Sequence, residues 1–118
     1  MKLNIKNETG RLRSVVLGQP NSMGGIPTLE ESYDAKSYYT IEHNNYPKEE
    51  DIINEMNAFE AVLKKYDVQV FRPDIIEDYN QVFARDVAFV IEDKMIISNV
   101  IADRADEQEA YKKVFEEV

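Results

Sequence analysis

The 118-residue sequence contains no cysteine and only one histidine. Without cysteine the chain can form no disulfide and carries no thiol nucleophile, and a single histidine does not favour a zinc site. We therefore expect neither a metal nor a cofactor in this chain. His43 lies in a polar segment just before Pro47, and we interpret it as a solvated loop side chain rather than a catalytic base.

The sequence also lacks a cluster of lysine and arginine and any long apolar run. The 23 acidic side chains outnumber the 14 basic ones and give a formal charge of -9. No basic stripe is present to neutralise phosphates, so we expect no nucleic-acid partner. No apolar run approaches the roughly 20 residues of a membrane-spanning helix. Because the N-terminus shows no secretory signal, we expect no membrane partner and a cytoplasmic location.

The 43% hydrophobic content and the length fit one domain spanning residues 1–118. An apolar strand at 15–17 precedes a helix over about 47–66 and a second strand at 68–71. This order predicts α/β layering with parallel strands if the two strands are neighbours. The predicted helix has one apolar stripe, which we expect to pack in the core: Ile52, Met56, Phe59, Leu63 and Tyr66.

Residues 21–46 show no stable periodicity and are expected to form a long loop. Loops of this length in compact domains are often lids, and the tyrosines in the segment favour one that packs part of the time. Farther on, apolar runs at 87–91 and 95–97 flank a short polar turn and predict a hairpin. A last helix is expected over about 106–117.

The pair Arg85 and Asp86 stands at the entrance of the predicted hairpin. Successive side chains of a strand face opposite ways, so only one of the two is expected to point into a cavity. A carboxylate beside an apolar strand needs a partner, and a planar guanidinium is the best one available. That partner is either one of the chain's own arginines, in a structural ion pair, or a cation bound from outside. The residue types alone leave both interpretations open.

The motif Asn80-x-x-Phe83-x-Arg85-Asp86, the hairpin after it and Arg104-x-x-Glu107 resemble the N-terminal part of the guanidine-modifying enzyme superfamily. This superfamily includes arginine deiminases, dimethylarginine dimethylaminohydrolases and glycine amidinotransferases. The first strand, within residues 10–17, is similar to that of the superfamily as well. The resemblance implies part of a five-bladed α/β propeller, the pentein-like fold, with about two ββαβ-type units in this chain.

The resemblance also implies a small, arginine-like guanidine substrate. Asp86 would bind the substrate guanidinium, Asn80 and Phe83 would line its pocket, and Arg104 would meet the substrate carboxylate, while Arg85 would be structural. The superfamily's cysteine nucleophile has no counterpart here. We therefore expect this chain alone to be inactive as an amidinotransferase or amidine hydrolase.

Two other interpretations compete with this one. In the first, the chain is a noncatalytic domain of the same fold that self-associates into a homo-oligomer through exposed strand edges. In the second, it is an acidic α/β domain whose Asp86 only forms an internal salt bridge.

Overall fold

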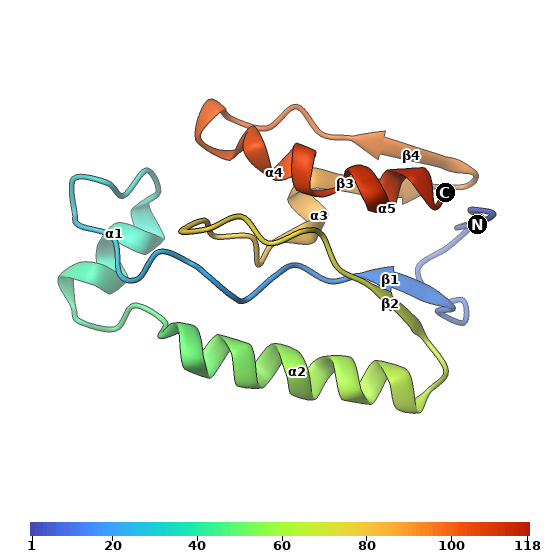
Figure 1. The fold of residues 1–118 in the computed structure, drawn as a ribbon, viewed down its shortest axis with the longest axis horizontal. Helices are drawn as coiled ribbons and strands as arrows, with labels where there is room; N and C mark the ends of the chain where they lie inside the picture. Colours follow the sequence, from blue (N-terminus) through green and yellow to red (C-terminus); the bar gives the residue numbers. More distant parts are fainter.

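The computed structural model describes all residues 1–118 and shows a mixed α/β chain with two separate two-stranded sheets. In the first sheet, β1 (Ser14–Val16) pairs in parallel with β2 (Gln69–Phe71), and the long connection between them ends with α2 (Glu49–Lys65) (Figure 1). The predicted strand, helix and parallel strand are therefore confirmed.

Charged residues stabilise both ends of helix α2. Acidic residues 49–51 fill its first turn, and Lys64 and Lys65 lie in its last turn, so both ends are complementary to the helix dipole. The predicted apolar stripe is only partly buried. Leu63 is buried, but Phe59 is 51% exposed and Tyr66 is 68% exposed. The expectation that the whole stripe packs in the core is wrong, because only Leu63 and Met56 of the stripe belong to or pack against the core cluster.

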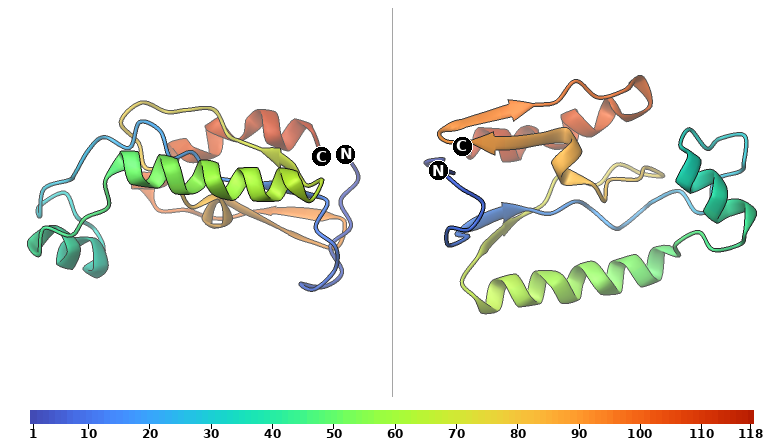
Figure 2. Two further views of the ribbon diagram at one scale, coloured as in Figure 1. Left: turned by 90° about the horizontal axis from the view of Figure 1, so that it is seen from below. Right: turned by 180° about the vertical axis from the view of Figure 1, so that it is seen from behind.

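The β1–β2 sheet lies between two small cores. Leu17, with Val15 beside it, packs toward Leu63 of α2, whereas Val16 packs on the other side against Val87 and its neighbours. This division follows from the alternation of side chains along a strand. The C-terminal helices and the hairpin therefore lie on the side of the sheet opposite α2, as two further views show (Figure 2).

The predicted hairpin is confirmed as β3 (Ala88–Ile91) and β4 (Lys94–Ile97), paired antiparallel across a turn in which Glu92 has φ 54°. Its entrance differs from the prediction. The segment Ala84–Val87 forms a helical turn, α3, so Asp86 does not begin the strand. The strand starts after Val87, whose side chain is fully buried and fixes the turn against the second core.

Two other expectations need correction. The segment 21–46 is not wholly a loop, since it contains α1 (Ala35–Glu42), which has no buried residue and projects from the rest of the chain (Figure 1). The single C-terminal helix expected over 106–117 is divided into α4 (Asp106–Ala110) and α5 (Lys112–Glu116), after a 3₁₀ turn η1 (Ala102–Arg104). The division falls at Tyr111, whose ring is buried in the second core. No helix has the length and apolar character needed to cross a membrane.

Candidate functional site

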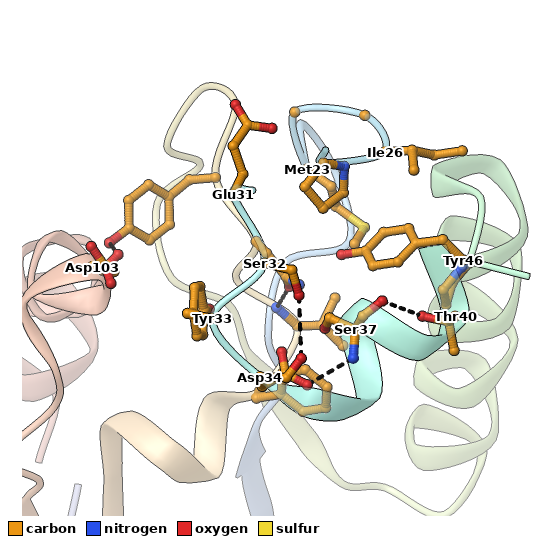
Figure 3. A pocket seen from close by; sticks show the side chains of 18 of the residues that line it. Met23, Ile26, Glu31, Ser32, Tyr33, Asp34, Ser37, Thr40, Tyr46 and Asp103 are labelled. Atoms are coloured by element: carbon orange, nitrogen blue, oxygen red, sulfur yellow. Dashed lines mark hydrogen bonds between the residues drawn. The ribbon is translucent and has the colours of Figure 1, made fainter. Parts of the chain in front are cut away.

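An open cleft of about 920 Å³ lies between segment 21–46, the loop at 78–83 and the turn at Arg104 (Figure 3). Segment 21–46 supplies more than half of its 23 lining residues. The cleft brings together all four residues singled out from the sequence: Asn80, Phe83, Asp86 and Arg104. Asn80 accepts a hydrogen bond from the Val82 N–H at 3.2 Å, and the Phe83 ring is 60% exposed at the cleft.

Gln81 holds the loop that carries Asn80 and Phe83. Its side chain is fully buried, and its amide donates to the Asp74 carbonyl at 2.9 Å and accepts from the Ile76 N–H at 2.7 Å. The Gln81 backbone carbonyl accepts from the Gln19 N–H at 2.9 Å. The sequence did not reveal this residue, because glutamine is usually exposed and no local pattern marks a buried one.

Gly18 lets the chain after β1 approach this loop closely. A β-carbon at Gly18 would lie 2.2 Å from the Val82 carbonyl oxygen and 2.3 Å from that of Gln81. Both neighbours are backbone atoms, so no side chain can move away to make room. Only glycine allows the loop at 78–83 to approach as closely as it does.

Asp86 and Arg104 form an ion pair at the cleft wall. Arg104 Nη1 donates to Asp86 Oδ2 at 2.6 Å, while Arg104 Nε and Nη2 donate to the two oxygens of Glu107 at 2.5 and 3.2 Å. Glu107 is fully buried, so its forked contact anchors the guanidinium. These contacts, first of all the one with Glu107, raise the pKa of Arg104 above its already high ordinary value. Arg104 is thus permanently charged and fixed in orientation.

Asp86 is less completely engaged than its partner. Its side chain is 53% exposed, compared with 16% for Arg104. Only Oδ2 accepts a hydrogen bond, and Oδ1 has no partner. The structure therefore shows the internal pairing that the sequence left open, but it also leaves one carboxylate oxygen free at the cleft.

The cleft lining is predominantly acidic. Lys36 and Arg104 are its two basic residues, against five carboxylates: Glu31, Asp34, Asp78, Asp86 and Asp103. Hydrogen bonds from Ser37, at the start of α1, lower the pKa of Asp34, and hydrogen bonds from Thr28 lower the pKa of Glu31. These two groups remain ionised at neutral pH, so the cleft favours cations.

Aromatic rings form much of the remaining wall. Tyr33 and Tyr46 lie on opposite sides of Ser32 (Figure 3), and Tyr79 and Phe83 also line the cleft. Burial raises the pKa of Tyr46, which keeps its hydroxyl protonated at neutral pH. Faces of aromatic rings attract cations, including guanidinium groups. Acidic and aromatic side chains therefore favour the same class of ligand. The sequence did not reveal the contribution of Tyr33, Asp34 and Tyr46, because it depends on how a distant segment folds back over the loop.

The remaining chemical candidates lie elsewhere. His43 is outside the cleft lining, and its Nδ1 lies 2.8 Å from the Tyr39 carbonyl oxygen while its ring stacks on that of Tyr39. Arg85 is exposed and makes no ion pair. No group of three or more histidine or carboxylate side chains is arranged to hold a metal ion.

Comparison with known proteins gave no further guide. No protein-family model, curated protein or solved structure matched this chain.

Proposed function

We propose that this chain is the guanidinium-binding, N-terminal segment of a guanidine-modifying enzyme acting on arginine-like substrates. The observation that carries the proposal is Asp86, a half-exposed residue of an acidic, tyrosine-lined cleft whose Oδ1 accepts no hydrogen bond within the chain. A guanidinium fits this environment because it is planar, donates hydrogen bonds to carboxylates and stacks on aromatic rings. The resemblance of residues 80–86 and 104–107 to that superfamily supports the same class of ligand.

Arg104 acts in this proposal as a positioning residue. Glu107 anchors it with two hydrogen bonds, so it stays in place when a ligand arrives and holds the Asp86 carboxylate through Oδ2. Each nitrogen of the Arg104 guanidinium already donates a hydrogen bond within the chain, Nη1 to Asp86 and Nε and Nη2 to Glu107. We therefore assign the ligand guanidinium to Asp86 and assign no contact with the ligand carboxylate to Arg104.

The proposed fold of the complete enzyme is the five-bladed α/β propeller, of which this chain would supply about two ββαβ-type units. The β1–α2–β2 unit and the β3–β4 hairpin with its following helices are the elements that support this. The superfamily reaction needs a thiolate that attacks the amidine carbon, and the present chain has no cysteine. The chain's own contribution is therefore to bind and orient the guanidinium.

A backbone amide NMR titration with L-arginine tests this proposal. We expect saturable shifts at the cleft residues Asp34, Tyr46 and Asn80, and weaker shifts with citrulline, which has the same shape but no charge. Asp86→Asn should abolish the arginine-specific shifts. Asp93→Asn is the matched control, because Asp93 lies at the hairpin turn with 70% of its side chain exposed and loses the same charge outside the cleft.

The Asp86–Arg104 contact favours a second candidate, in which Asp86 serves only the stability of the chain. In that case arginine and citrulline would give equal shifts, and Asp86→Asn would lower stability without changing them. This result would contradict guanidinium binding.

A further inference from the structure

The chain exposes more surface than a compact monomer of its mass. Its accessible area is 8693 Å², whereas a folded monomer of 13.7 kDa is expected to expose about 6,600 Å². The excess of about 2,100 Å² exceeds the roughly 800 Å² that each partner buries in a standard protein interface. There is thus ample surface for a second chain to cover.

The outer edge of β4 is open to such a partner. The second sheet contains only β3 and β4, and β4 forms its outer strand (Figure 2). The Ser98 N–H donates to the Val87 carbonyl, so the neighbouring pair Ala88–Ile97 is a non-hydrogen-bonded pair of the ladder. Because the two kinds of pair alternate along the ladder, the pair Val90–Met95 is also non-hydrogen-bonded. The backbone N–H and C=O groups of Met95 and Ile97 therefore point away from β3 and are unpaired in the ladder.

One face of the hairpin is also apolar and exposed. Phe89 and Ile96 are directly opposite each other and are 42% and 39% exposed, and Ile91, two residues along β3, is 52% exposed. Side chains two residues apart on a strand, and those directly across from each other, share one face of a sheet. No proline or bulge interrupts β4 to prevent pairing at its edge.

We infer that a second copy of this chain pairs with β4 in antiparallel register about a twofold axis at Ile96. Met95 then exchanges both backbone hydrogen bonds with Ile97 of the partner, and Ile97 does the same with the partner's Met95. The two hairpins form one four-stranded sheet whose exposed face is continuous across the axis. An antiparallel edge is self-complementary, as a twofold interface requires. This inference concerns the 118-residue chain by itself and does not rest on guanidinium binding.

The negative charge of the two copies weakens this dimer. Each chain carries a formal charge of -9, so the two copies repel each other, and added salt should screen the repulsion and strengthen pairing. Because the paired strands are short, we expect a dissociation constant on the order of micromolar, typical of a small interface.

Cysteine cross-linking tests the register directly, because the chain has no cysteine of its own. Side chains in a non-hydrogen-bonded pair on the axis are close enough for a disulfide. Ile96→Cys should therefore oxidise rapidly to a covalent dimer. Val62→Cys is the control, on a similarly exposed position of α2 (51%), and should cross-link only slowly. Equal rates for the two variants would overturn the inference.

Sedimentation measurements test the edge contact. Ile97→Pro removes an N–H that points away from β3, so the hairpin should remain while the dimer weakens at least tenfold. Ile97→Val keeps that N–H and should dimerise like the unmodified chain. Circular dichroism checks that Ile97→Pro remains folded; if it unfolds, Ile96→Lys, which places a charge on the axis, replaces it. A monomer at all concentrations, or a dimer that these changes leave intact, would contradict the inference.

Discussion

The guanidinium of Arg104 donates to the Asp86 carboxylate over 2.6 Å, and thus occupies one of the two oxygens that a guanidine ligand would use. The Arg104 side chain thus places a guanidinium, the group proposed for the ligand, at the cleft wall. Since Glu107 anchors Arg104 from behind, the contact leaves Asp86 oriented and half exposed rather than enclosed.

Glu107→Gln should destabilise the fold strongly. The change removes the buried charge that neutralises Arg104, and breaking one side of a buried ion pair costs about 3–5 kcal/mol. Urea unfolding monitored by circular dichroism measures the loss. Glu109→Gln is the control, because its ion pair with Lys112 is exposed and should contribute about 1 kcal/mol or less. Similar losses for the two variants would show that the buried pair has no special role.

Gly18→Ala should destabilise the chain and displace the loop at 78–83. The added β-carbon would lie 2.2 Å from the Val82 carbonyl oxygen, and overpacking of this kind typically costs about 1–3 kcal/mol. Gly10→Ala places its β-carbon 3.1 Å from the oxygen of the exposed Asn7 side chain and should change stability little. Thermal unfolding compares the two, and a Gly18→Ala protein as stable as the unmodified chain would contradict the close approach.

Tyr111→Phe should leave stability unchanged or raise it by up to about 1 kcal/mol, because the buried Tyr111 hydroxyl has no hydrogen-bond partner. Burial also raises the pKa of Tyr111. As the pH rises past about 10, the unfolded chain loses this proton while the folded chain keeps it, so stability falls. Tyr111→Phe should reduce that alkaline loss in urea titrations between pH 9 and about 11. An unchanged alkaline slope would argue against burial of the hydroxyl.

Glu60→Gln should lower stability at neutral pH more than at acid pH. Hydrogen bonds from Lys64 and Arg72 lower the pKa of Glu60 in the folded chain. The stabilisation is therefore present above the ordinary glutamate pKa of about 4.3 and is lost as the pH falls through the lower folded value. The difference in unfolding free energy between the two proteins should shrink between pH 6 and about 3. A difference in unfolding free energy that does not change with pH would show that ionisation of Glu60 is not the source of the stabilisation.

The sequence predicted the elements whose signals are local. Alternating or helical apolar patterns bounded by turn residues indicated β1, β2, α2 and the hairpin. Helix α1 gave no such pattern because none of its residues is buried; the Asp34 side chain instead caps it by accepting from the Ser37 N–H. The helical turn at Asp86 was missed because an apolar run continues directly from it.

The site was predictable only in part. The motif residues Asn80, Phe83, Asp86 and Arg104 were named from the sequence, and the structure places them around one cleft. The pairing of Asp86 with Arg104 and the hydrogen bond from the Gln19 N–H to the Gln81 carbonyl join segments that are distant in the sequence. No local pattern encodes such contacts.

The most direct test of guanidinium binding is the side-chain carboxyl ¹³C shift of Asp86 during titration with L-arginine and, separately, with citrulline. A partly exposed ion pair is worth about 1 kcal/mol or less, so we predict binding of arginine up to about fivefold tighter than citrulline, with an Asp86 shift that saturates at a lower concentration of arginine than of citrulline. An Asp86 shift that does not respond to arginine, while the Arg104 contact stays intact, would contradict the proposed role of this carboxylate.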